Sequence, residues 1–239
     1  MPGETLYRFL KHALDVTVWG GELIGDVELP PDSPAVFVAN HAGAMGPIGI
    51  AASMPVRLYP WIIGDMVDSQ RAGPYLRKDF IRPELHLPDG LAIPVSAWLS
   101  RITVPLLRSL GCIPVWHDRE LLETYRITDE ALAAGRCLLI FPEDPDQPID
   151  DRTGLRPFKT GFARLGSLHF ARTRQSLQFY PIAVHRVGRR VQVGEPIAYN
   201  PMNAEAHERR RVAHVLESII AAMLAGRGER LGARVHEIP

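Results

Sequence analysis

Three apolar runs of sequence constrain the fold of this chain more than any other feature. Residues 36–39 and residues 137–141 carry no charged or amide side chain, and residues 177–184 carry only one. Such uninterrupted apolar strands are expected where helices cover both faces of a sheet. Stretches with helical spacing of apolar residues lie between these runs. We therefore predict an α/β fold, a single domain with a mixed or partly parallel central sheet flanked by helices.

The same spacing predicts helices at both ends of this domain, which we expect to span residues 1–239. An amphipathic helix falls within residues 1–20 and a closing helix within residues 205–225, on either side of a motif-bearing core at residues 35–197. Two roles fit the first helix: its apolar face packs on the domain, or it lies on a lipid surface. Residues 55–95 are rich in proline, glycine and arginine and are hard to assign, apart from an expected strand at residues 58–63 and an expected short helix at residues 72–80. Further helices are expected at residues 95–110, 121–134 and 159–171.

The chain is electrically balanced, with 27 Lys and Arg residues against 27 Asp and Glu residues. No global field therefore favours a nucleic-acid partner. Cys112 and Cys137 are the only cysteines, and each lies in an apolar run, which is typical of a reducing compartment. No spacing of Cys, His or acidic residues matches a metal-binding motif, so we expect neither a metal site nor a bound cofactor.

The sequence predicts neither a signal peptide nor a membrane span. The N-terminus lacks the basic start and apolar core of a signal peptide. The most apolar stretch, residues 91–110, is interrupted by serines and two arginines, whereas a span needs about 20 apolar residues. We therefore expect a cytoplasmic protein whose contact with a membrane, where it has one, is peripheral. The oligomeric state is left open.

Three polar segments directly follow predicted strands. They are Asn40-His41, residues 116–119 and residues 141–144. In an open α/β sheet the ligand crevice lies beyond the carboxyl ends of the strands. We therefore expect His41, Arg119 and Glu143 to converge on one site, although they are far apart in sequence.

In their order along the chain and in their residues, these segments resemble the conserved blocks of the glycerophospholipid acyltransferases, the family that includes the lysophosphatidic acid acyltransferases. Asn40-His41 matches the start of the family's His-x4-Asp block, and residues 141–143 (FPE) match the start of its Phe-Pro-Glu-Gly block. Further matching segments are residues 111–115 (GCIPV) with Asp118-Arg119, residues 157–161 (PFKTG), residues 180–184 (YPIAV) and residues 193–197 (VGEPI).

The resemblance implies transfer of a fatty acyl group from an acyl thioester to the hydroxyl of a lipid acceptor. The donor would be acyl-CoA or acyl carrier protein, and the acceptor a glycerol phosphate, a lysophospholipid or a related alcohol. His41 would be the general base that takes the proton of the hydroxyl. Arg119 or His117 would fill the arginine position of the second block and bind the acceptor's phosphate. Glu143 and Lys159 would shape the same acceptor site.

Two positions depart from the family's pattern. Gly46 stands where the family has the aspartate that fixes the histidine tautomer, so another acid would have to orient His41. The candidates are Glu143, Asp144 and Asp65. Asp144 itself replaces the glycine of the third block and adds a negative charge that repels a phosphate.

The small-residue turn that holds Gly43 and Gly46 has two interpretations. These residues let a helix pack closely on the sheet, or they leave room for an acyl chain and free N–H groups for an oxyanion. The missing aspartate leaves three functional hypotheses open. They are an active acyltransferase, a catalytically weak or inactive relative that binds acyl chains or lipids, and a thioester hydrolase.

Overall fold

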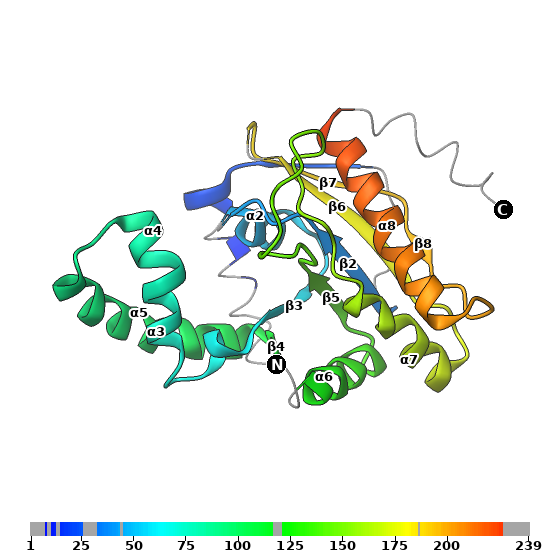
Figure 1. The fold of residues 1–239 in the computed structure, drawn as a ribbon, viewed down its shortest axis with the longest axis horizontal. Coiled ribbons are helices and arrows are strands. Elements are labelled where there is room, and N and C mark those ends of the chain that lie inside the picture. The colour runs from blue at the N-terminus through cyan, green and yellow to red at the C-terminus, as the bar shows by residue number, and fades with distance from the viewer. Residues whose placement is uncertain are drawn as a thin grey trace. The chain divides into compact units, whose positions relative to one another are not determined.

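The computed structural model describes residues 8, 11–12, 15–25, 33–43, 45–116, 121–185 and 187–226 (Figure 1). The chain divides into two compact units. The described residues of Tyr59–Thr128 form the helical unit, and those of Arg8–Leu58 and Asp129–Pro239 form the sheet unit. The domain bounds expected from the sequence stay a prediction.

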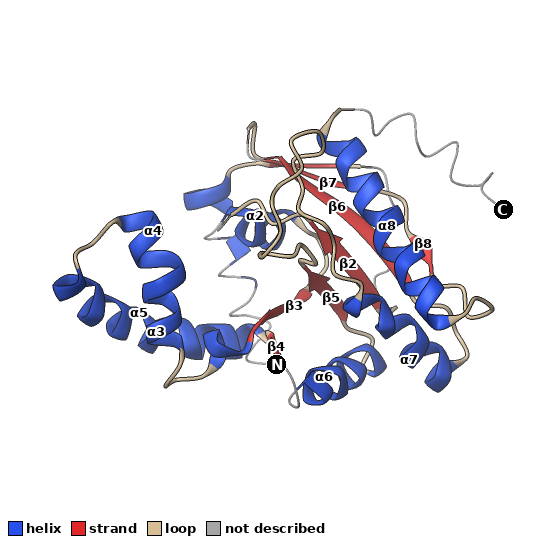
Figure 2. Cartoon of the chain, viewed as in Figure 1, coloured by secondary structure: helices blue, strands red, loops and turns tan. Residues whose placement is uncertain are grey.

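The sheet unit is built on a mixed, mostly parallel sheet (red in Figure 2). Its strands are β1 (Glu22–Ile24), β2 (Ala35–Ala39), β5 (Cys137–Ile140), β6 (Gln178–His185), β7 (Arg190–Val193) and β8 (Ile197–Ala198). The order is β1-β7-β6-β2-β5, and β8 pairs with β6. β2 runs parallel to both β5 and β6, β1 runs parallel to β7, and β7 and β8 are antiparallel to β6.

Helices cover both faces of this sheet. They are α2 (Met45–Ser53), α7 (Arg164–Thr173) and α8 (Glu205–Leu224). On one face, Phe37 of β2 stacks on Tyr180 of β6 with ring centroids 4.9 Å apart, and both belong to a buried cluster that includes Ile50 of α2. Phe179 precedes Tyr180 and therefore points to the opposite face, where α8 lies along β6 (Figure 1). The predicted α/β fold with a mixed sheet flanked by helices is confirmed.

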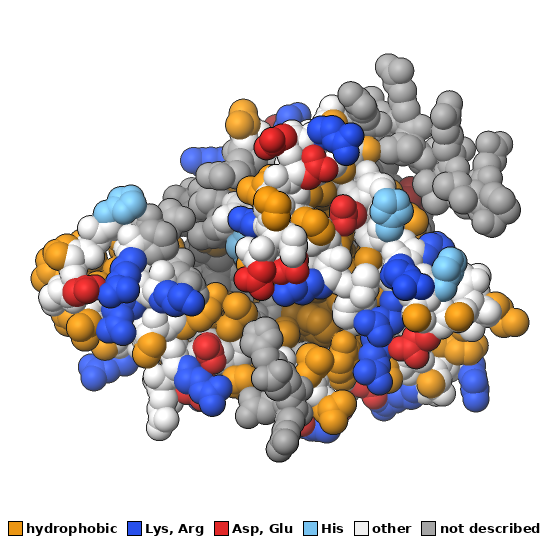
Figure 3. Space-filling model, viewed as in Figure 1, with side chains coloured by type: hydrophobic (Ala, Val, Ile, Leu, Met, Phe, Trp, Pro, Cys, Tyr) orange, Lys and Arg blue, Asp and Glu red, His pale blue; other side chains and the backbone are white. Residues whose placement is uncertain are grey.

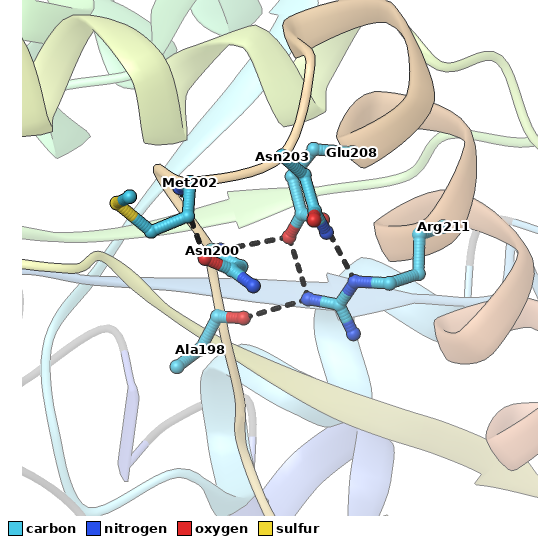
Figure 4. A network of polar contacts seen from close by, with 6 residues as sticks. All are labelled: Ala198, Asn200, Met202, Asn203, Glu208 and Arg211. Carbon is cyan, nitrogen blue, oxygen red and sulfur yellow. Dashed lines mark hydrogen bonds and ion pairs between the residues drawn. The ribbon is translucent and has the colours of Figure 1, made fainter. Parts of the chain in front are cut away.

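A buried ion pair joins the first turns of α8 to the end of β8 (Figure 4). The Glu208 side chain is fully buried and lies 2.6 Å from the Arg211 guanidinium. Its carboxylate also accepts hydrogen bonds from the Asn200 backbone N–H and the Asn203 side chain, and Arg211 donates to the Ala198 carbonyl. Burial alone would raise the pKa of Glu208, but these hydrogen bonds outweigh it and hold that pKa below its usual range.

Two parallel strands, β3 (Leu58–Ile63) and β4 (Ile113–Val115), flank a run of helices in the helical unit. Short helical segments follow β3, none longer than five residues, and precede the long helix α5. They are η2 (Gly64–Val67), α3 (Ala72–Leu76), η3 (Arg77–Ile81) and α4 (Arg82–Leu85). After β4, the hydroxyl of Thr124 in α6 (Leu121–Ala133) donates to the Pro114 carbonyl and accepts from the Trp116 N–H, which fixes the end of the strand.

The helix α5 (Asp89–Leu110) begins six residues earlier than the sequence predicts. Pro94 lies inside it on the exposed side, where the carbonyl of exposed Gly90, which has no helical partner, can reach water. The helix ends at Gly111 in the left-handed conformation, as predicted. Within the described residues, α5 alone is long and apolar enough to cross a bilayer, despite its serines and arginines. Such an apolar helix is compatible with association of the protein with a membrane surface.

The predicted terminal helices have different outcomes. Most of residues 1–20 lie outside the described residues, apart from helical residues at 8 and 11–12 and a π-helical turn at Asp15–Trp19. The closing helix is α8, which ends at Leu224.

Candidate active site

The side chain of Asn40 fixes the point at which the chain leaves β2. Asn40 is buried at the end of the strand, and its amide nitrogen donates to the Val184 carbonyl of β6 at 3.2 Å. Its amide oxygen accepts from the Val184 N–H at 2.7 Å. The side chain thus makes two bonds that a strand backbone would otherwise make, while the backbone is free to turn.

The parallel register of β2 and β5 brings His41 level with Glu143. Val36 lies opposite Leu138 and Val38 opposite Ile140, a constant offset of 102 residues, which is also the separation of His41 and Glu143. The Oε1 atom of Glu143 accepts a hydrogen bond of 2.5 Å from the backbone N–H of His41. The convergence expected for these two residues at the strand ends is therefore present in the sheet unit.

The second oxygen of Glu143 binds the loop that follows β5. Its Oε2 atom accepts a hydrogen bond of 3.0 Å from the backbone N–H of Arg156. The backbone of Glu143 also forms an antiparallel bridge with Phe158, whose N–H donates to Glu217 of α8. The Glu143 carboxylate therefore positions two backbone segments, and both of its oxygens are engaged.

The imidazole of His41 is exposed and lies edge-on to the ring of Phe141, with centroids 5.4 Å apart. Among the described residues, no carboxylate makes a hydrogen bond to this ring. The ring is thus open to an incoming group, and Phe141 is its aromatic neighbour. An imidazole in such a place can accept a proton from a bound hydroxyl.

Position 46 has room for a Cβ atom. Gly46 lies in the first turn of α2, and its N–H donates to the Gly43 carbonyl at 3.2 Å. A Cβ atom on Gly46 would lie 3.5 Å from the Ala42 Cβ and 3.7 Å from the Asn40 carbonyl, which are ordinary contacts. Gly43 is exposed in the left-handed conformation, with φ of 64°, which glycine adopts without strain.

Asp144 forms an ion pair with Lys159, which is predicted to shape the site of the acceptor substrate. The two side chains are 3.1 Å apart, and the hydrogen bond from Lys159 is the main reason that the pKa of Asp144 lies below its usual range. The N–H of Asp146 lowers it further. The Arg156 guanidinium donates to two carbonyls of the same loop, those of Pro145 and Gln147. The extra carboxylate is thus largely neutralised by Lys159.

The remaining predicted site residues lie elsewhere or outside the described residues. Asp65 belongs to the helical unit, where it lies 3.6 Å from the Arg71 guanidinium. His117 and Arg119 fall outside the described residues, directly after β4. Within the part of the chain that the structure describes, no group of three His, Cys, Asp or Glu residues is suited to a metal ion.

Both cysteines are poor nucleophiles. Burial raises the pKa of the Cys112 thiol to about 12 and also raises the pKa of Cys137. Both thiols are therefore protonated at neutral pH, and only the thiolate is reactive.

Sequence reasoning missed three residues of this site: Asn40 as the anchor of the turn, Arg156 as the second partner of Glu143, and Glu217. Asn40 carried a signal, because an amide directly after an apolar strand cannot stay buried without partners. Glu217 accepts a hydrogen bond from the N–H of Phe158, which is 59 residues away in the sequence, and no local pattern marks it.

The parallel β2, β5 and β6, with helices on both faces and an imidazole at their carboxyl edge, define an α/β protein with a mixed, mostly parallel sheet. The chain is similar to the crystal structure of the 1-acyl-sn-glycerophosphate (LPA) acyltransferase PlsC from Thermotoga maritima, with a TM-score of 0.54. The match covers 93% of this chain and 80% of that chain at 15% identity, and it shows the fold. No protein-family model and no curated protein matches the sequence. The resemblance is thus confirmed at the level of the fold, and the correspondence of motifs stays a prediction.

Proposed function

We propose that this protein is an O-acyltransferase that moves a fatty acyl group from an acyl thioester to the hydroxyl of a glycerolipid-type acceptor, with His41 as general base. The observation that carries the proposal is the exposed His41 ring at the carboxyl end of β2, on a backbone that Asn40 and Glu143 hold in place. The shared fold with a glycerophosphate acyltransferase supports the same reaction class.

The reaction needs only one proton carrier on the protein. Neutral His41 takes the proton of the acceptor hydroxyl while its oxygen attacks the thioester carbonyl. The carbon–sulfur bond then breaks, and the thiolate leaves and takes the proton back from the imidazolium. The ester forms without a covalent enzyme intermediate, because the acceptor itself attacks. Backbone N–H groups in the turn around Gly43 are the candidates for stabilising the oxyanion.

The ion pair of Asp144 and Lys159 bears on whether the acceptor carries a phosphate. Because Asp144 neutralises Lys159, Lys159 offers little free charge to a phosphate. Arg119 and His117 remain the proposed phosphate ligands. This favours a test of uncharged alcohols beside glycerol phosphate and lysophospholipids. Acyl-CoA and acyl carrier protein are both proposed donors, and we propose that the protein works in the cytoplasm at the surface of a membrane.

The test is release of free thiol from acyl-CoA and from acyl carrier protein, measured with purified protein and each class of acceptor. We expect acceptor-dependent thiol release that is lost in His41→Ala. His207→Ala removes another exposed imidazole of the sheet unit, and it should leave the rate unchanged. Equal rates for wild type and His41→Ala would overturn the proposal. Product analysis separates ester from the free acid that a thioester hydrolase would make.

A second candidate function is binding of acyl chains or lipids without catalysis. It is favoured by one observation: no carboxylate of the described residues bonds to the His41 ring, and Gly46 has no side chain to supply one. In serine proteases, removing the charge of the orienting acid costs about 10⁴ in turnover. Tight binding of a fatty acid by a protein that consumes no thioester would support this candidate.

A further inference from the structure

The helix α5 packs a face of small residues and leaves large apolar side chains exposed on the opposite face. Its buried residues follow a spacing of four: Ala92, Ser96, Ser100 and Val104. This stripe packs on η2, α3 and η3 of the helical unit, and Gly73 of α3 comes close to it: a Cβ there would lie 3.7 Å from the Ser100 hydroxyl oxygen. Ser96 and Ser100 donate to carbonyls of their own helix, so the stripe presents few free polar groups.

The opposite face carries the large side chains. Leu91, Trp98 and Ile102 are spaced by seven and four residues and therefore lie on one side of the helix. They are 56%, 61% and 47% exposed. A helix at the surface of a water-soluble domain normally turns charged and polar residues to this side. The outer face of α5 thus has an apolar surface that the described residues leave uncovered.

Beyond Asp89 in its first turn, α5 itself carries only cations. Residues 90–116 contain no Asp or Glu, and their only charged residues are Arg101 and Arg108. The carboxylate at the start of the helix, Asp89, is bound by Arg82 at 2.7 Å. Among the described residues, Arg101 has no hydrogen-bond or ion-pair partner. Figure 3 shows apolar side chains gathered at the end of the helical unit where α4 meets α5, next to Lys and Arg side chains.

We infer that the outer face of α5, defined by Leu91, Trp98 and Ile102, is the surface with which this protein lies on a bilayer containing anionic phospholipid. Aliphatic side chains enter the acyl region, Trp favours the interface, and arginine pairs with headgroup phosphates. A second copy of the chain fits less well, because two such faces would bring cations to cations without a carboxylate between them. The proposed lipid acceptor is the reason for expecting a bilayer, and the surface itself is independent of catalysis at His41.

The inner stripe of α5 decides that the helix lies on the bilayer and does not cross it. Crossing would strip Ala92, Ser96, Ser100 and Val104 from the segments that cover them in the helical unit. With the inner stripe packed, the outer face is the larger apolar surface of α5 that is free for lipid; on the inner side, Ile93 near the start of the helix is also exposed. The helix axis is then parallel to the membrane surface, and Arg101 can reach the headgroups.

The test is co-sedimentation of the full chain with vesicles of phosphatidylcholine alone and of phosphatidylcholine mixed with phosphatidylglycerol. We expect binding to the anionic vesicles, and a fall of about tenfold or more in the partition coefficient for Leu91→Gln/Trp98→Gln/Ile102→Gln. Arg101→Gln should lower it by about fivefold. The matched control is Val187→Gln/Met202→Gln, because both residues are 88% exposed and lie in the sheet unit. It should bind as wild type does.

Three outcomes would overturn the inference: wild type that binds neither vesicle, a triple variant that binds as tightly as wild type, or a triple variant that loses self-association in solution instead. If the triple variant does not fold, the wild type is tested with vesicles of brominated lipid instead. These lipids should quench the fluorescence of Trp98 in the wild type, and this quenched component should be absent in Trp98→Phe. A thiol-release assay with a soluble acceptor separates the two proposals, because the outer face can fail to bind lipid while His41 still works.

Discussion

The backbone N–H of His41 donates a hydrogen bond of 2.5 Å to the Oε1 atom of Glu143, a residue 102 positions further along the chain. The parallel register of β2 and β5 produces this contact, and the second Glu143 oxygen extends it to Arg156. One carboxylate therefore sets the position of the candidate base through the backbone, while the imidazole stays free.

Replacing Glu143 tests this role directly. In Glu143→Ala the N–H groups of His41 and Arg156 lose their acceptor, and we expect the free energy of unfolding to fall by about 1–3 kcal/mol. Turnover should fall more than the apparent affinity for acceptor, because the base is displaced. Urea unfolding and steady-state kinetics measure the two effects. Asp151→Ala removes an exposed carboxylate nearby and should change neither. Unchanged turnover in a folded Glu143→Ala would show that the contact does not position the base.

The room at position 46 predicts the effect of restoring an acid. In Gly46→Asp, we expect turnover to rise by up to about 10⁴, because a carboxylate on the imidazole fixes its tautomer and stabilises the imidazolium. The Cβ itself meets only ordinary contacts. Gly46→Asn is the matched control, since it has the same shape without the charge and should raise turnover far less. Equal rates for the two variants would argue against an orienting role for the charge.

Close packing at Gly166 predicts a cost in stability. Gly166 is buried in α7, and a Cβ there would lie 2.1 Å from the Cδ2 and 2.8 Å from the Cβ of buried Tyr199. Because the clash reaches the Cβ, a rotation of the ring cannot relieve it. We expect Gly166→Ala to lower the free energy of unfolding by about 1–3 kcal/mol, measured by thermal unfolding. Gly90→Ala, with nothing within 4 Å, should not have this cost.

The buried pair of Glu208 and Arg211 predicts a dependence of stability on pH. The folded-state pKa of Glu208 lies below its ordinary value of 4.5, so the folded state binds this proton less readily than the unfolded state. The stabilisation is therefore complete above pH 4.5 and is lost as the pH falls through the folded pKa. As the pH falls from neutral through the folded pKa of Glu208, the free energy of unfolding should decrease less in Glu208→Gln than in wild type. Urea unfolding at a series of pH values measures this decrease. An equal decrease in the two proteins would contradict the prediction.

The apolar runs predict β2, β5 and β6 because a strand with both faces covered has little freedom in its composition. The end of α5 at Gly111 is equally local, since a left-handed residue there favours glycine. Within residues 55–95, the predicted strand at residues 58–63 is β3, and the predicted short helix at residues 72–80 corresponds to α3 with η3. The other segments could not be assigned, because they are too short to show a period and the stability of each depends on packing within the helical unit.

The site divides in the same way. That His41 and Glu143 follow strands and converge at one edge of the sheet could be predicted, whereas the pairing of these two strands and the atoms that join the residues could not. Glu143 was predicted to orient the ring or bind the acceptor, but in the structure both of its oxygens bind backbone N–H groups. This depends on the register between β2 and β5, which is set by tertiary packing.

The ordinary contacts that a Cβ would make at Gly46 have an evolutionary consequence. Two of the four glycine codons are one base away from an aspartate codon, and a Cβ at this position would meet only ordinary contacts. An acid at position 46 can therefore be one mutational step away, and its first side-chain atom fits there without displacing a neighbour.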